Sequence, residues 1–359
     1  MKVAILGAGN IGFASAAWLA HRGHQPILWS PAAEDLAPLQ ANQRRLSFSG
    51  VIDGACQPEV TTDIAYAVNA ADALFICVPG YAHKTVIDSL VRHIRGGQPA
   101  IINSACSLSA LYLSKRLAER RIDAPIITWG TTLLTARRQA GGYSVAIMAA
   151  RRIVHVATLP MQANQQAIAL CGTLFGDHFQ AQRNTLATSL ININPIAHLG
   201  LALCNITRIE REESWPQYHY LTPGVANLIG ALEQERQTVA RRFGLQIHGI
   251  EEHFQQSFNV AQNTLADIAA ELHRRRGGPA GPTSMDTRFI LEDTPYGLAF
   301  AEAIAQKAGI ALTLHSSVIN VAAAIWKKDL RQQNNILPEL GLEAMSLSEF
   351  DRVVCDGFR

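Results

Sequence analysis

A glycine-rich turn near the N-terminus constrains the fold of this chain more than any other feature. The apolar run KVAIL (2–6) is typical of a buried parallel strand, and GAGNIG follows it directly. Gly7, Gly9 and Gly12 therefore have the GxGxxG spacing, and a helical pattern covers residues 10–22. In such a unit the first glycine makes the tight turn, the second lets backbone approach a pyrophosphate, and the third allows close helix packing.

The runs that follow extend this unit into a sheet. Strand-like runs recur at 26–30, 73–78, 99–103 and 125–129, and helical patterns separate them. This alternation predicts an α/β fold with a Rossmann-type, doubly wound parallel sheet. The helix N-terminus after the turn would direct free N–H groups toward the cofactor phosphates. The cofactor-binding residues expected from this turn are Gly7, Gly9, Asn10, Ile11 and Gly12.

The second strand ends in Ser30, where NAD-binding sheets usually place an acidic residue against the ribose 2′-hydroxyl. A serine leaves room for a 2′-phosphate, so we expect Ser30 to contact the cofactor and NADP to be favoured over NAD. Ser30 ahead of Pro31 would equally well cap a helix. The nearest following arginines, Arg44 and Arg45, lie some distance along the chain.

The segment CVPGYAH (77–83) ends a strand at the carboxyl edge of the sheet, where open α/β sheets bind their ligands. We therefore expect Val78 and Pro79 to contact the cofactor, although a plain strand-to-helix loop would give the same pattern.

The second half of the chain is helical. Helical patterns cover 184–210, 222–243, 247–272, 296–308 and 315–330. With 359 residues the chain is long enough for two domains. We predict a dinucleotide-binding domain at 1–182 and an all-helical substrate and catalytic domain at 183–359.

An apolar stretch at 191–207 carries polar side chains on one predicted helical face. Asn194, His198 and Asn205 are spaced by four and seven residues, and Pro195 fits after an Asn194 cap or at a kink. A buried polar group without a partner costs about 1–3 kcal/mol, so three of them predict a polar cleft. A lone core histidine with a satisfied hydrogen bond is the alternative.

The segment 285–298 supplies partners for this face. Arg288 can bind a carboxylate through two hydrogen bonds, and Asp293 can orient an imidazole and stabilise its charged form. The alternative for Arg288 is an ordinary i,i+4 surface pair with Glu292.

Composition argues against several classes of function. The net charge is +2 and the densest basic cluster, at 273–278, is short, so we expect no nucleic-acid partner. We expect no apolar run to reach the length needed to span a bilayer, and therefore no membrane partner. The six cysteines lack metal-ligand spacing, which predicts no metal site and favours a reducing, cytoplasmic setting.

The motifs together resemble the opine (octopine/nopaline) dehydrogenase family over nearly the whole chain. LGAGNIG, VPGYAH and NINPIAH are similar to the family's glycine turn, its VPAxxH segment and its Asn-x-Asn-x-x-x-His motif. TPGVANLIGALEQER and TRFILEDTPYGL resemble its TPSV…DAER helix and its TRY…EDVPYGL segment. TTLLTARR (131–138) is similar to a run that places Arg137 on the family's motif arginine.

This resemblance implies an NAD(P)-dependent oxidoreductase acting on CH–NH donors. Such an enzyme condenses an amino acid with a 2-oxo acid and reduces the product to an N-(carboxyalkyl)amino acid. The resemblance makes His198 and Asp293 the catalytic pair, places Arg288 on the family's motif arginine and matches Asn205 to a family asparagine. We expect the substrate-binding residues to be Arg288, Asn205 and Asn194. We also expect a homodimer.

Departures from the family pattern leave the substrates open. Leu199 replaces a proline, no acidic-glycine pair precedes Thr222, and NSACSLSA (103–110) lacks the family's glycines. Two other hypotheses remain: a ketopantoate-reductase-like or 2-hydroxyacid dehydrogenase that reduces a single keto acid, and a non-catalytic dinucleotide sensor.

Overall fold

A computed structural model describes residues 1–358 of the chain, apart from the side chain of residue 276, and divides them into two compact units. The Rossmann unit comprises Met1–Ser189 and the segment from Ser348 onward, and the helical unit comprises Leu190–Leu347. This division differs from the sequence-based boundary at 182/183. The Rossmann unit extends seven residues further than expected, and the C-terminal segment belongs to it and not to the helical unit.

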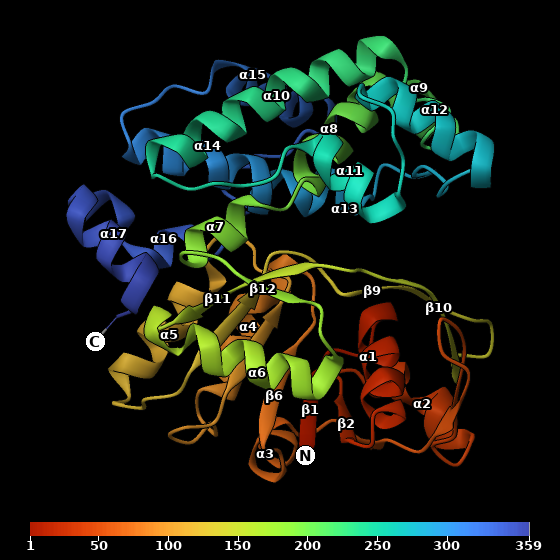
Figure 1. Cartoon of the computed structure of the whole chain (residues 1–359), viewed down its shortest axis with the longest axis vertical. Coiled ribbons are helices and arrows are strands. Elements are labelled where there is room, and N and C mark those ends of the chain that lie inside the picture. The colour runs from red at the N-terminus through yellow and green to blue at the C-terminus, as the bar shows by residue number, and fades with distance from the viewer. Residues whose placement is uncertain (359) are drawn as a thin grey trace. The chain divides into compact units, whose positions relative to one another are not determined.

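The Rossmann unit is built on an eight-stranded sheet (Figure 1) with strand order β12-β11-β8-β7-β6-β1-β2-β5. Its strands are β1 (Lys2–Leu6), β2 (Gln25–Trp29), β5 (Glu59–Thr61), β6 (Ala73–Ile76), β7 (Ala100–Asn103), β8 (Ile126–Trp129), β11 (Val154–Leu159) and β12 (Phe179–Ala181). All neighbours pair in parallel except β11, which runs antiparallel to β8. The five predicted strands correspond to β1, β2, β6, β7 and β8. Leu6 pairs with both Trp29 and Ile76, so three strands end together beside the glycine turn.

Helices cover the sheet because their small and apolar faces pack on continuously buried strands. They are α1 (Asn10–His21), α2 (Ala33–Ala41), α3 (Ile64–Ala70), α4 (Gly80–Leu90), α5 (Ser109–Glu119), α6 (Asn164–Phe175), α7 (Thr185–Leu190) and α17 (Leu347–Asp356), with a 3₁₀ turn at Met161–Ala163. Phe75, Trp129 and Phe175 form an aromatic cluster with ring centroids 4.9–5.2 Å apart. α17 packs on this unit, where Thr185 donates a hydrogen bond to the carbonyl oxygen of Val354.

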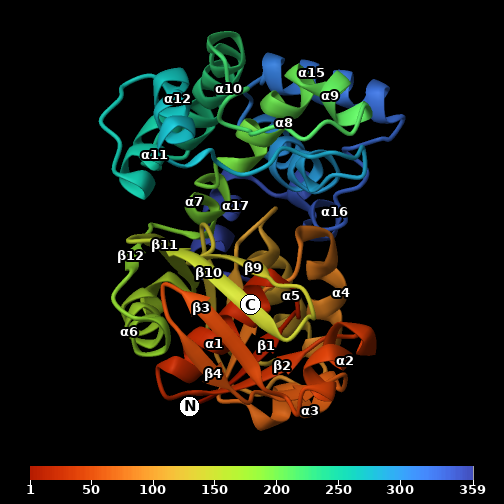
Figure 2. The same ribbon diagram turned by 90° about the vertical axis from the view of Figure 1, so that its right-hand side faces the viewer.

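A second, four-stranded sheet was not predicted. Its order is β4-β3-β10-β9, formed by β3 (Leu46–Gly50), β4 (Gly54–Cys56), β9 (Leu134–Arg138) and β10 (Ser144–Ala150). The sheet packs on α1 through β3, β9 and β10 (Figure 2). It therefore brings residues 134–150 beside the helix that follows the glycine turn.

The helical unit consists of α8 (Asn194–Cys204), α9 (Ile206–Glu210), α10 (Pro223–Arg242), α11 (Ile250–Phe258), α12 (Leu265–Arg276), α13 (Arg288–Leu291), a π-helical turn (Thr294–Leu298), α14 (Ala299–Lys307), α15 (Thr313–Trp326), α16 (Leu337–Leu340) and a 3₁₀ turn (Leu342–Ala344). This architecture confirms the predicted fold class. Two predicted helices are broken: 184–210 is divided by Ile191–Ile193 and Asn205, and 247–272 is interrupted after Asn259, which has a positive φ.

The stretch Thr185–Cys204, which spans α7 and α8, is apolar and long enough to cross a membrane by composition alone. The sequence expectation that no run reaches that length was therefore wrong. However, 67% of the most apolar window is buried inside the fold, as in the core helix of a globular protein.

Candidate active site

His198 and Asp293 lie side by side in the helical unit. Nδ1 of His198 is 2.7 Å from Oδ2 of Asp293, and the two residues are 95 positions apart in the sequence. The Asp293 side chain is 6% exposed and that of His198 is 19% exposed. The carboxylate is therefore shielded from water, whereas part of the imidazole remains accessible.

Local packing explains why these two side chains meet. Oδ1 of Asn192 accepts a hydrogen bond from the backbone N–H of Asn194, so Asn192 supports the start of α8. Asn194 itself is the first residue of the helix and not its cap, contrary to one sequence expectation. Gly297 packs directly on Pro195, because a Cβ at Gly297 would lie 2.2 Å from the proline ring. This close approach holds the π-helical turn, which follows Asp293, against α8.

The imidazole of His198 is held on a second side by Phe289. The two rings are parallel within 1° and their centroids are 3.7 Å apart. Among the described residues, none makes a hydrogen bond to Nε2 of His198. An imidazole held through Nδ1, with Nε2 available, is the arrangement in which histidine transfers a proton to or from a bound molecule.

The other predicted substrate residues make local contacts or are half-buried. Asn194 is half-buried at the start of α8. Asn205 is buried just beyond the last residue of α8, and its amide donates a hydrogen bond to the carbonyl oxygen of Leu201. Arg288 is 62% exposed, and its Nε lies 3.4 Å from Glu292, which is the i,i+4 pair considered as the alternative. Substrate binding by these three residues stays a prediction.

The glycine turn has the geometry expected for a dinucleotide site. Gly7 has a φ of +130°, and a Cβ there would lie 2.7 Å from the carbonyl oxygen of Cys77 and 2.9 Å from the Val78 side chain. A Cβ at Gly12 would lie 1.8 Å from the carbonyl oxygen of Gly7, so only glycine lets α1 pack this closely. Gly9 has no neighbouring atoms within 4 Å of its Cβ position, which leaves room for a phosphate to approach.

The first turn of α1 is bonded to the small sheet. Oδ1 of Asn10 accepts a hydrogen bond from the backbone N–H of Arg138, whose guanidinium lies 4.0 Å from the ring centroid of Phe13. Ile11 is partly exposed. Arg137, the residue placed on the motif arginine by resemblance, is exposed on β9, and the adjacent Arg138 faces α1 instead. Sequence reasoning missed Arg138, because one residue of register on a strand decides which side chain faces inward.

Ser30 is 2% exposed and has no spare donor. Its hydroxyl donates to Oδ2 of Asp35 at 2.6 Å and accepts from the backbone N–H of Ala32 at 3.3 Å. Ala32, not Ser30, is the N-cap of α2. The serine predicted to meet a 2′-phosphate therefore stands beside a carboxylate.

A buried histidine in the VPGYAH segment connects two loops at the carboxyl edge of the sheet. Nε2 of His83 donates to the carbonyl oxygen of Val78 at 3.1 Å, and Nδ1 lies 3.6 Å from the Cys106 sulfur. Burial lowers the pKa of His83 to about 4, against the opposing effect of the Val78 hydrogen bond. His83 thus joins the loop after β6, which carries Pro79, to the loop after β7. Sequence reasoning did not single it out.

Comparison with known proteins shows what each unit of the chain is similar to. A family model described as "NAD/NADP octopine/nopaline dehydrogenase, alpha-helical domain" matches residues 181–326. The chain is 28% identical to opine dehydrogenase from Arthrobacter sp. (strain 1C) over 348 residues, 96% of each chain. The helical unit therefore matches the octopine/nopaline dehydrogenase family model, and nearly the whole chain is similar to an opine dehydrogenase. A family model described as "NAD-dependent glycerol-3-phosphate dehydrogenase N-terminus" matches residues 2–108.

Solved structures share the fold of the whole chain. A structure of octopine dehydrogenase in complex with NADH and agmatine matches with a TM-score of 0.80 at 15% identity, covering 96% of this chain and 97% of that one. A structure of NADP⁺-bound yersinopine dehydrogenase matches with a TM-score of 0.75 at 15% identity, covering 96% and 99%. These findings confirm the predicted resemblance to the octopine/nopaline dehydrogenases and identify the chain as an NAD(P)-dependent oxidoreductase. Among the described residues, no group of three or more His, Cys, Asp or Glu side chains could hold a metal ion.

Proposed function

We propose that this protein is an NAD(P)H-dependent opine dehydrogenase acting on CH–NH donors. The amine of an amino acid and the carbonyl of a 2-oxo acid condense with loss of water, and reduction of the imine gives an N-(carboxyalkyl)amino acid. The observation that carries this proposal is the His198–Asp293 pair in the unit that matches the family's helical domain. The relatives support the reaction class, since they include an opine dehydrogenase and an octopine dehydrogenase bound to NADH and agmatine.

The residues of the glycine turn fit the cofactor. The open space at Gly9 and the N-terminus of α1 would hold the pyrophosphate, with Asn10 and Ile11 providing N–H groups of the first turn and Val78 and Pro79 bordering the turn. When bound, the nicotinamide supplies the hydride that reduces the substrate carbon.

His198 performs the proton transfer in this proposal. Its Nε2 gives a proton to the oxygen or nitrogen attached to the reacting carbon and takes it back in the reverse reaction. Asp293 stabilises the imidazolium form and keeps Nδ1 oriented away from the substrate. Phe289 restricts rotation of the ring. Arg288 would bind a substrate carboxylate by exchanging its contact with Glu292, and Asn194 and Asn205 complete the proposed substrate-binding set.

Three finer points belong to this proposal. Ser30 alone favours NADP, but its hydrogen bond to Asp35 argues for NAD, and we adopt NADH as the preferred reduced cofactor. The six cysteines are free thiols, which supports a reducing, cytoplasmic setting. The homodimer stays a prediction, to be checked by size-exclusion chromatography with light scattering.

A substrate panel tests the proposal. Amino acids and simple amines are combined with pyruvate, 2-oxoglutarate or glyoxylate, and oxidation of NADH and NADPH is followed by absorbance. The proposal predicts oxidation that requires both an amine and a keto acid. Equal turnover without any amine would identify a single keto-acid reductase, and dinucleotide binding without turnover would identify a sensor.

A further inference from the structure

Two opposite charges lie together where β2 ends. Oδ2 of Asp35, in the first turn of α2, accepts the Ser30 hydroxyl at 2.6 Å. The guanidinium of Arg138 lies near the Asp35 carboxylate, which tends to raise the pKa of Arg138, while burial has the larger effect and lowers it. In a Rossmann unit this is the region that receives the adenosine ribose.

Arg138 fixes the distance between this carboxylate and the glycine turn. Its Nη1 donates to the carbonyl oxygen of Ala8 at 3.0 Å, and its Nη2 donates to the carbonyl oxygens of Asp35 at 3.2 Å and Gly142 at 3.1 Å. One guanidinium therefore holds α2 against the residue between Gly7 and Gly9. The Phe13 ring supports it from one face.

The Asp35 carboxylate at this point favours a hydroxyl over a phosphate. The Ser30 hydroxyl already donates to Asp35 and accepts from Ala32, and Nη2 of Arg138 already serves two carbonyls. No described residue makes a hydrogen bond to Oδ1 of Asp35. This carboxylate oxygen can accept a hydrogen bond from a ribose 2′-hydroxyl, whereas a 2′-phosphate would meet its negative charge.

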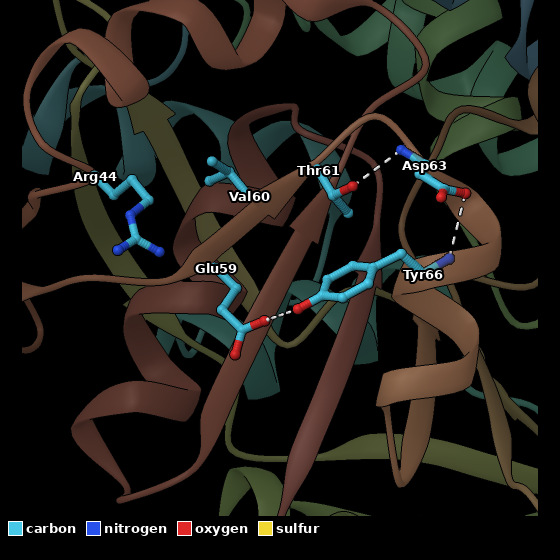
Figure 3. A pocket seen from close by; sticks show the side chains of 6 residues that line it. All are labelled: Arg44, Glu59, Val60, Thr61, Asp63 and Tyr66. Atoms are coloured by element: carbon cyan, nitrogen blue, oxygen red, sulfur yellow. Dashed lines mark hydrogen bonds between the residues drawn. The ribbon is translucent and has the colours of Figure 1, made fainter.

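The nearest arginine that follows in the sequence lies close to a different carboxylate. Arg44 lines a pocket of about 560 Å³ at the edge strand β5, together with Glu59, Thr61 and Tyr66 (Figure 3). The hydrogen bond from Tyr66 lowers the pKa of Glu59, and attraction to Lys2 and Arg44 acts in the same direction. Arg44 thus interacts with the Glu59 carboxylate.

We propose that Asp35 selects NAD(H) over NADP(H), and that Ser30 and Arg138 are the positioning residues that hold its carboxylate beside the glycine turn. This inference rests on the proposed function, because it requires a dinucleotide at that turn. It reverses the preference for NADP that the sequence suggested through Ser30, and it assigns the acidic group of the ribose site to a helix instead of to the end of the strand.

Direct binding tests the inference without any substrate. NADH and NADPH are titrated into wild-type protein, Asp35→Asn and Asp35→Ser, and the dissociation constants are measured by fluorescence. Wild-type protein is expected to bind NADH roughly tenfold or more tightly than NADPH. Both substitutions should reduce that ratio by about tenfold, mainly because NADPH binds more tightly once the charge is removed. The second substitution covers the case in which asparagine prevents folding.

Matched variants identify the cause of any change. Glu34→Gln removes one negative charge from the same turn of α2 on an exposed side chain, and it should leave the ratio unchanged. Ser30→Ala should reduce the ratio by less than Asp35→Asn, because the carboxylate stays but loses its anchor. Arg138→Met should weaken both dinucleotides alike, because it loosens the glycine turn.

The outcomes separate this inference from the proposed function. A wild-type preference for NADPH, or a ratio that Asp35→Asn does not change, would overturn the role of Asp35 even if amine-dependent turnover is observed. The expected ratios without amine-dependent turnover would support Asp35 and overturn the opine dehydrogenase reaction instead. Failure to bind either dinucleotide would overturn both.

Discussion

Replacing Asp293 by asparagine tests the proposed proton-transfer pair with the smallest change in shape. The amide keeps the size of the carboxylate and can still hydrogen-bond to Nδ1 of His198, but it no longer carries the charge that stabilises an imidazolium. Since the proposed reaction charges and discharges the imidazole, the substitution should lower kcat while leaving the fold and dinucleotide binding intact.

The expected magnitude follows from the geometry. The Nδ1–Oδ2 distance is 2.7 Å, and both side chains are less than one fifth exposed. A hydrogen bond to a charged group contributes about 1.5–3 kcal/mol, and two unit charges about 4 Å apart attract by about 4 kcal/mol at an effective dielectric constant of about 20. A loss of about 2–4 kcal/mol corresponds to a fall in kcat of roughly 30- to 1,000-fold.

The helical unit contains a second pair that serves as a control. Nδ1 of His315 lies 2.7 Å from Oε2 of Glu235, but the His315 side chain is 1% exposed. The Glu235 carboxylate also accepts the backbone N–H groups of Leu314 and His315 at the start of α15. Glu235→Gln should therefore lower Tm by a few degrees through loss of a helix cap, about 1 kcal/mol, and spare kcat.

The assay compares kcat and Tm for wild-type protein and the two variants under saturating substrates. The account predicts opposite patterns. Asp293→Asn should lower kcat and leave Tm unchanged, whereas Glu235→Gln should lower Tm and leave kcat unchanged. An Asp293→Asn protein with near-normal kcat and a lowered Tm would show that the His198–Asp293 pair is structural, and the proton-transfer mechanism would be refuted.

The remaining predictions concern substrate, cofactor and pH. Arg288→Lys should raise KM for one acid substrate severalfold without changing dinucleotide affinity, because lysine cannot form the two-point carboxylate contact. If steady-state and binding assays show that substrate and dinucleotide affinity fall equally, Arg288 has a structural role. Gly12→Ala should lower both Tm and dinucleotide affinity, because its Cβ would overlap the Gly7 carbonyl oxygen. Gly9→Ala should lower only the dinucleotide affinity. Thermal denaturation and fluorescence titration distinguish the two variants. The pKa of His83 is lowered to about 4 in the folded protein. Between about pH 6.5 and 4 the unfolded state therefore binds one more proton at this residue than the folded state. The free energy of unfolding should fall by up to about 1.4 kcal/mol per pH unit as the pH is lowered through this range. His83→Gln should remove this slope in urea denaturation series, and an unchanged slope would contradict the assignment.

Features that depend on local pattern could be predicted from the sequence. Five of the parallel strands were predicted because each is a short apolar run in the sequence. The spacing of Gly7, Gly9 and Gly12 fits the observed packing of α1. Family resemblance and helical spacing also predicted that His198 and Asp293 act as a pair. Their side chains are in hydrogen-bond contact although 95 residues separate them, and their catalytic role stays a prediction.

Features that depend on distant pairing were not predicted. In the four-stranded sheet, β3 pairs in parallel with β10, so Ser47 lies opposite Ser144, and no local signal connects such segments. The face shared by Asn194, His198 and Asn205 assumed one continuous helix, but α8 ends at Cys204 and Asn205 bonds back to the backbone.

The hydrogen-bond partners in the cofactor region could not be predicted for the same reason. Ser30 could be seen in the sequence, but its partner Asp35 comes from the following helix. Arg138 comes from a strand more than a hundred residues away, and its neighbour Arg137 carried the family resemblance. A one-residue difference in strand register decides which of the two arginines faces the glycine turn.

The most direct test of reductive condensation is to follow the hydride into the product. The enzyme is supplied with reduced dinucleotide carrying deuterium at the transferable position, with the best amine and keto acid from the panel, and the products are analysed by mass spectrometry. The account predicts an N-(carboxyalkyl)amino acid with one deuterium on the carbon that was the keto carbonyl, and none of this product without the amine. A deuterated 2-hydroxy acid formed at the same rate with and without the amine would contradict it.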